Sequence, residues 1–139
     1  MFQRNCLGLA DAQRILAAVL EAAQAQGLAP AVAIADDHGE LVCYARMDDA
    51  PLSAQRAARR KAYTAALMRA ATLEFREQMR ERGRSLADYG DPALTRLQGG
   101  KPLIYQGRCV GAIGVAGTPP AQDEALADLG VRAFADATG

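Results

Sequence analysis

The 139-residue sequence contains no tryptophan, a single histidine and only three cysteines. Cys6, Cys43 and Cys109 form no Cys-x-x-Cys pair, which excludes the common zinc-finger and thioredoxin-like motifs. A Ser-His-Asp triad would have to use His38, and no Gly-x-Ser-x-Gly elbow accompanies that residue. The carboxylates show no metal-ligand spacing. The sequence therefore predicts no metal site.

Neither sign of charge is in excess, because 16 Lys and Arg residues balance 16 Asp and Glu residues. A nucleic-acid-binding protein usually shows a basic excess, so we expect no nucleic-acid partner. No apolar run approaches the length of a membrane span, and the first ten residues lack a signal-peptide pattern. We therefore expect a cytoplasmic protein with reduced thiols and no membrane partner.

Half of the residues are hydrophobic, and many of these are alanine. The length fits one domain, and no linker or repeat divides the chain, so a single domain over residues 1–139 is predicted. Helical periodicity predicts four main helices, over Leu9–Gln26, from Pro51 to about Ala71, over Glu74–Arg84 and from Thr118 to about Ala137. Asp48 or Asp49 is expected to cap the second of them.

Two hairpins are predicted from short apolar runs on either side of a turn, Ala31–Ala35 with Leu41–Met47 and Leu103–Tyr105 with Arg108–Ala116. In Leu41–Met47, alternation places Val42, Tyr44 and Arg46 on one face. Hairpins imply antiparallel pairing, so the predicted class is α+β. We expect an antiparallel sheet of four to five strands, flanked by helices.

Lys61 is the most informative single residue of the sequence. At 100° per residue it falls inside a helical stripe of small side chains that includes Ala58, Ala62 and Ala65. Burial can lower the pKa of a lysine and prepare it as a base or as a Schiff-base amine. The alternative is a lysine whose stem covers the alanines while its ammonium reaches the rim.

Arg46 ends a predicted strand just before the helix that carries Lys61. An arginine and a lysine that approach from a strand end and a helix suit a carboxylate or another anion. Asp48 is a further candidate ligand contact. The alternative is an ion pair between Arg46 and an aspartate at a surface turn.

Thr64 lies one helical turn after Lys61 and is a candidate hydrogen-bond donor to the same ligand, or it bonds its own backbone. Gly99 and Gly100 allow close backbone approach and complete the predicted ligand site. His38 is the one candidate cofactor ligand, in a turn where polar residues are common anyway. The start of the last helix is a poor anion site, since prolines remove donors and Asp123 already opposes the positive helix end.

Several segments resemble the GlcG/HbpS-like family of haem-degrading domains, in the family's order along nearly the whole chain. They are Asp36–Leu41, Arg46–Pro51, Arg60–Ala65, Gly99–Leu103, Gly111–Gly117 and Gln122–Glu124. The resemblance implies an antiparallel sheet between helices in a profilin-like, three-layer arrangement, homo-oligomers, and haem as a ligand of some members. The sequence departs from many relatives at Ala116, where they carry serine, and in the charged segment 75–91.

These observations support a small-molecule-binding domain with an anion-binding pocket, with haem as the cofactor that the resemblance suggests. The alternative is a cofactor-free isomerase, lyase or hydrolase on a small anionic catabolic intermediate, with Lys61 and Arg46 as catalytic residues. A third alternative is an assembly subunit without a ligand.

Overall fold

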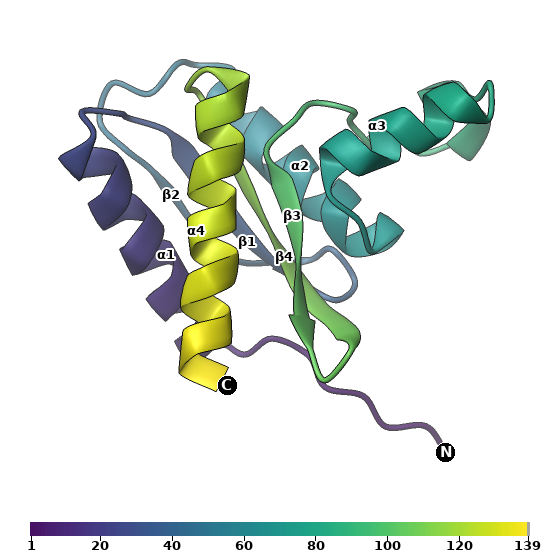
Figure 1. Ribbon diagram of the computed structural model, residues 1–139, viewed down its shortest axis with the longest axis horizontal. Coiled ribbons are helices and arrows are strands. Elements are labelled where there is room, and N and C mark those ends of the chain that lie inside the picture. Colours follow the sequence, from purple (N-terminus) through teal and green to yellow (C-terminus); the bar gives the residue numbers. More distant parts are fainter. Residues whose placement is uncertain (139) are drawn as a thin grey trace.

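The computed structural model describes residues 1–138. Its elements follow the predicted order of helix, hairpin, helices, hairpin and helix (Figure 1). They are α1 (Leu9–Ala25), β1 (Ala31–Asp36), β2 (Leu41–Arg46), α2 (Ala54–Met68), α3 (Thr72–Glu81), the 3-10 turn η1 (Leu86–Tyr89), β3 (Gly100–Tyr105), β4 (Arg108–Ala116) and α4 (Pro120–Thr138). Within this range no helix is long and apolar enough to span a membrane.

The four strands form one antiparallel sheet in the order β2-β1-β4-β3. Helices α1 and α4 lie side by side on one face, and α2 packs on the other (Figure 1). Helix α3 and η1 extend away from one side of the sheet. The α+β class and the antiparallel sheet between helices are thereby confirmed.

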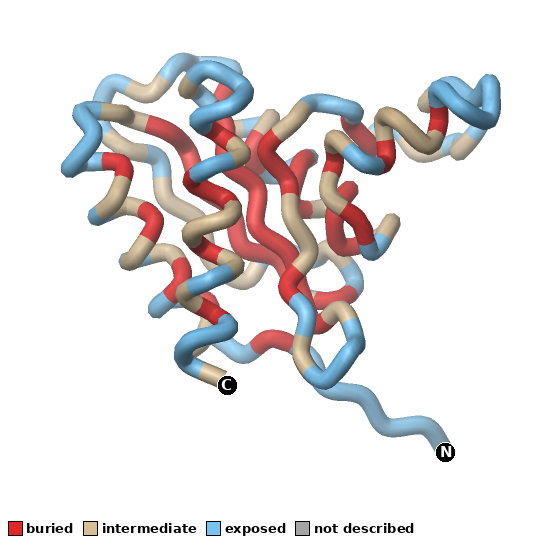
Figure 2. The backbone as a smooth tube through the Cα atoms, viewed as in Figure 1, coloured by how far each residue is buried: buried red, intermediate tan, exposed pale blue. Residues whose placement is uncertain are grey.

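The two faces of the sheet are packed with side chains of different size. In β1, Val32 and Ile34 enter a core of large side chains with α1 and α4, whereas Ala31, Ala33 and Ala35 pack against the alanines of α2. Figure 2 shows that β1 and β4, the two central strands, are buried along most of their length. Small side chains on the second face let α2 approach the sheet closely.

Gly114 marks the closest approach between α2 and the sheet. A Cβ atom at this position would lie 2.1 Å from the carbonyl oxygen of Ala58 and 2.6 Å from the amide nitrogen of Ala62. Only a residue without a side chain fits there. This contact fixes how deeply the middle of α2, including Lys61, sits on the sheet.

Three local features differ from the predictions. Helix α2 begins at Ala54 after Ser53, so neither Asp48 nor Asp49 caps it; Asp49 instead adopts a left-handed conformation with φ of 66° in the loop before the helix. Strand β3 begins at Gly100 rather than at the predicted Leu103, because the backbone of Gly100, Lys101 and Pro102 already pairs with β4. An irregularity between β1 and β2 turns Val42 toward the core of large side chains, away from the face of Tyr44.

Candidate functional site

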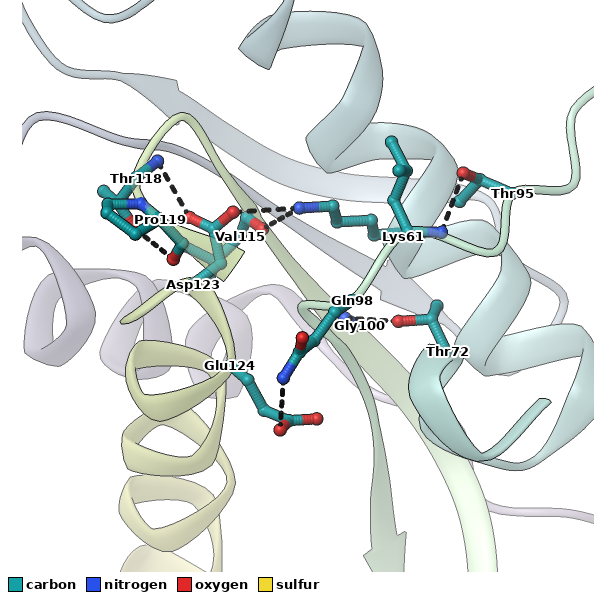
Figure 3. Close-up of polar contacts among 11 residues, drawn as sticks. Lys61, Thr72, Thr95, Gln98, Gly100, Val115, Thr118, Pro119, Asp123 and Glu124 are labelled. Atoms are coloured by element: carbon teal, nitrogen blue, oxygen red, sulfur yellow. Dashed lines mark hydrogen bonds and ion pairs between the residues drawn. The ribbon is translucent and has the colours of Figure 1, made fainter. Parts of the chain in front are cut away.

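Lys61 lies in the alanine stripe, as its helical position predicts, and it is almost completely buried. Its ammonium donates to the carbonyl oxygen of Val115 at 2.8 Å and to Oδ2 of Asp123 at 3.1 Å (Figure 3). Val115 is near the end of β4 and Asp123 is in the first turn of α4. Lys61 therefore links α2 to the opposite layer of the protein, beyond the end of a strand.

Asp123 is as deeply buried as its partner. Its other carboxylate oxygen, Oδ1, accepts hydrogen bonds from the backbone N–H of Thr118 at 3.0 Å and from the Thr118 hydroxyl at 2.6 Å. Burial lowers the pKa of Lys61, and the attraction and hydrogen bond of Asp123 act in the opposite direction. Both charges are thus satisfied by bonds within the protein, as buried charges require.

The Gly99-Gly100 backbone lies next to Lys61. A Cβ atom at Gly99 would be 3.0 Å from the Lys61 ammonium, and one at Gly100 would be 2.5 Å from the Lys61 carbonyl oxygen. The N–H of Gly100 donates to the Thr72 hydroxyl at 3.0 Å. The structure therefore brings together three predicted site residues, in a tightly packed region rather than on an open surface.

Thr64 is fully buried, and its hydroxyl accepts a hydrogen bond from the backbone N–H of Thr95 at 2.9 Å. This hydrogen bond is not made within its own helix. The Thr64 side chain is also buried and not open to solvent. Its contact instead fixes the loop that precedes β3 against α2. The Thr64 oxygen thus accepts from a different segment of the chain, and this bond does not use the hydroxyl proton of the predicted donor.

Arg46 and Lys61 do not point toward a common pocket. Arg46 is exposed at the end of β2 and donates to the side-chain oxygen of Gln55 at 3.1 Å, and Asp48 is exposed in the following loop. Within residues 1–138, Arg46 forms no ion pair with an aspartate. The roles of Arg46, Asp48, Lys61, Thr64 and the two glycines toward a ligand stay predictions.

His38 is exposed in the β1–β2 turn, which Asp36 organises by accepting hydrogen bonds from the N–H groups of His38 and Glu40 at 2.9 and 3.0 Å. The histidine lines a surface hollow of about 480 Å³ together with residues from the N-terminal segment, the end of α2 and the β3–β4 hairpin. We call this the His38 hollow. It unites segments that are far apart in the sequence.

Cations dominate the polar wall of the His38 hollow, where three arginines face one carboxylate. Arg4 pairs with the buried carboxylate of Asp37 at 2.5 Å, and Arg69 donates to the Asp37 carbonyl oxygen at 2.6 Å. Arg108 forms no ion pair in the described part of the chain. Phe2 and Ile104 form the apolar part of the wall, and their exposed fractions are 72% and 48%.

The family model described as "Haem degrading protein HbpS-like" matches residues 7–132. The chain belongs to the HbpS-like family. It is 41% identical to Protein GlcG of Escherichia coli K12 over 105 residues, which cover 76% of this chain and 77% of GlcG.

Solved structures of HbpS-like proteins agree with this fold. A double mutant of Streptomyces reticuli HbpS has a TM-score of 0.85 at 31% identity, covering 100% of this chain and 91% of that one. The structure named PduOC:Heme Complex has a TM-score of 0.83 at 29% identity, with 92% and 94% covered.

Sequence reasoning on this HbpS-like chain missed four functional candidates, Asp123, Arg4, Arg69 and Arg108. A buried carboxylate partner such as Asp123 could have been expected, because a lysine that is buried in an apolar stripe is almost always paired. No local pattern identifies the arginines, because the tertiary fold alone assembles them around His38. In the described residues, no group of three or more His, Cys, Asp and Glu side chains could hold a metal ion.

Proposed function

We propose that this HbpS-like chain is a small-molecule-binding domain whose ligand is haem, bound in the His38 hollow. The observation that carries the proposal is the position of the only histidine on the wall of a hollow where three arginines face one carboxylate. The family description and the haem complex of a relative with the same fold support haem as the ligand.

The residues of the hollow fit haem chemically. An exposed imidazole is a common axial ligand of haem iron. Arginine binds carboxylates through paired hydrogen bonds, so Arg108 and Arg69 suit the propionates of haem. Phe2 and Ile104 provide apolar contact for the macrocycle, and about 480 Å³ is within the usual range of ligand pockets. When bound, haem would supply the redox chemistry of its iron.

The arginines of the hollow differ in how firmly the protein holds them. Arg4 is held by the buried Asp37 carboxylate, and Arg69 by the carbonyl oxygens of Asp37 and Ala66. These contacts orient two guanidinium groups before a ligand arrives, which lowers the ordering cost of binding. Arg108 has no such partner in residues 1–138, and we expect it to contribute most to propionate binding.

Absorbance titration of the protein with haem and with iron-free protoporphyrin tests this proposal. His38→Ala should change the Soret band of the haem complex and weaken haem binding about tenfold, while protoporphyrin binding should change little because only the iron contact is lost. Arg108→Gln should weaken both ligands, because it removes a charge-assisted bond to a propionate.

Arg132→Gln is the matched control, since Arg132 is an exposed arginine on α4, in the layer that covers the other face of the sheet from α2. It should leave both titrations unchanged. Cys109 also lines the hollow, and its thiol donates to the carbonyl oxygen of Gly111 at 3.2 Å. A haem spectrum that changes in Cys109→Ala and not in His38→Ala would contradict the assignment of His38.

The cofactor-free enzyme is the remaining alternative. It would use Lys61 as an acid or base, and this role requires the buried pair with Asp123 to open. We also propose that the chain forms homo-oligomers in the cytoplasm, because large apolar side chains are few and packing can be completed between subunits. A monomeric mass in light scattering would contradict that proposal.

A further inference from the structure

A groove runs between α2 and β2. Helix α2 packs mainly on β4, β1 and β3, and it leaves the edge strand β2 largely uncovered. The space beside the helix is a hollow of about 620 Å³, which we call the α2–β2 groove. Leu41 of β2 and Gln55, Arg56, Arg59, Arg60 and Tyr63 of α2 line it.

The cations of the α2–β2 groove have no carboxylate partner. Arg56, Arg59 and Arg60 form no ion pair among residues 1–138, although Glu40 also lines the groove. Arg46 reaches its rim from β2, because it donates to Gln55, which is one of the lining residues. The guanidinium groups of the three α2 arginines therefore line the groove, and that of Arg46 on β2 lies at its rim.

An unsatisfied hydroxyl lies on the same sheet face. The OH of Tyr44 is buried and has no hydrogen-bond partner among the described residues. In the β1–β2 register, Tyr44 lies opposite Ala33, and its strand neighbours Leu41 and Arg46 lie opposite Ala35 and Ala31. The Tyr44 side chain packs against the alanine layer under α2. Tyr44 does not line the groove and its hydroxyl is closed to solvent, so a ligand in the groove would contact Tyr63 and not the Tyr44 hydroxyl.

We propose that the α2–β2 groove is a second ligand site, which binds a small organic dicarboxylate. Three arginines of α2 line the groove and Arg46 stands at its rim, so two carboxylates can each meet a guanidinium, which offers a planar pair of donors. Leu41 and the Tyr63 ring provide contact for the carbon skeleton, which a bare inorganic anion would not use. The groove shares no lining residue with the His38 hollow, so the site does not depend on haem binding.

Isothermal titration calorimetry with succinate and with inorganic phosphate, at constant ionic strength, tests the proposal. Succinate should bind more tightly than phosphate. Arg59→Gln should weaken succinate binding about tenfold or more, because it removes a charge-assisted bond. Arg59 is the most informative position, since it is exposed and lines this groove only.

Tyr44→Phe removes only a buried hydroxyl outside the groove, so it should bind succinate like the wild type and serves as a control on the same sheet face. Arg132→Gln on α4 is the matched control and should bind succinate like the wild type. Haem titration of Arg59→Gln separates the two sites, since its Soret band should match the wild type when haem binds in the His38 hollow, which Arg59 does not line.

Three results would overturn the proposal. The first is no detectable heat with succinate, and the second is succinate binding that is unchanged in Arg59→Gln. The third is phosphate binding as tight as succinate binding and equally sensitive to Arg59→Gln, which would make the groove a general oxyanion site. A thermal melt of each variant confirms that it is folded before it is titrated.

Discussion

The ammonium of Lys61 lies 3.1 Å from Oδ2 of Asp123, and both side chains are about 5% exposed. The two residues come from helices on opposite faces of the sheet and meet beyond the end of β4 (Figure 3). The Val115 carbonyl oxygen and the N–H and hydroxyl of Thr118 complete their hydrogen bonds. This pair therefore connects all three layers of the fold at one point.

Lys61→Met should destabilise the protein strongly. The substitution keeps most of the side-chain volume but leaves the Asp123 carboxylate buried without its cation, which typically costs about 3–5 kcal/mol. Urea denaturation measures the change in the free energy of unfolding. Arg60→Met is the matched control on the exposed face of the same helix, and it should change stability by less than about 0.5 kcal/mol. Equal stability of the two variants would contradict a buried, charged pair.

Adding Asp123→Asn to Lys61→Met should recover part of the lost stability. Asparagine keeps an oxygen that accepts the hydrogen bonds of Thr118 and removes the unpaired charge. The double variant should therefore be more stable than Lys61→Met alone. Strictly additive losses in this double-mutant cycle would show that the two residues do not interact.

The contribution of Lys61 to the stability of the protein should rise with pH in the alkaline range. Burial lowers the pKa of Lys61 below its ordinary value of 10.5, and Asp123 only partly opposes this effect. Between the lowered pKa and 10.5 the unfolded chain still binds a proton that the folded protein has released, so the free energy of unfolding increases with pH. The difference in unfolding free energy between wild type and Lys61→Met, measured through that interval, should grow. A decrease would mean that attraction to Asp123 outweighs burial.

The burial of Lys61 was predictable because it depends on local geometry. Helical spacing alone places Lys61 among Ala58, Ala62 and Ala65, and the structure confirms this. The helices, both hairpins and the antiparallel class follow from similar local patterns of apolar residues and turns. Apart from the face of Val42, the differences lie at element ends, as in α2, where Pro51 precedes the first helical residue by three positions.

The arrangement around Lys61 was not predictable in the same way, because it depends on strand order. The order β2-β1-β4-β3 places Arg46 on an edge strand, while the Lys61 ammonium points past the end of β4. The loop between Arg46 and α2 is short, but it does not bring the two cations together. The sequence suggested a role for Asp123 only at the start of its own helix, because its partner Lys61 is 62 residues away in the sequence.

Gly114→Ala should destabilise the fold more than any exposed glycine substitution. The new Cβ would lie 2.1 Å from the Ala58 carbonyl oxygen, so α2 would have to move away from β4 along its whole packed face. Overpacking against backbone is not relieved by a change of rotamer, and we expect a loss of about 3 kcal/mol or more. Thermal or urea denaturation measures it.

Gly8→Ala is the control for Gly114→Ala, because a Cβ at Gly8 meets nothing within 4 Å and the backbone there has an ordinary φ of −91°. It should cost no more than about 1 kcal/mol, because Gly8 is the N-cap of α1 and alanine is a poorer cap than glycine. Movement of α2 away from the sheet also makes Lys61 less buried, so Gly114→Ala should lose part of the alkaline increase in stability predicted for the wild type. A Gly114→Ala variant that melts with the wild type would mean that α2 does not rest on the backbone of β4, and the depth at which Lys61 is buried would then need another explanation.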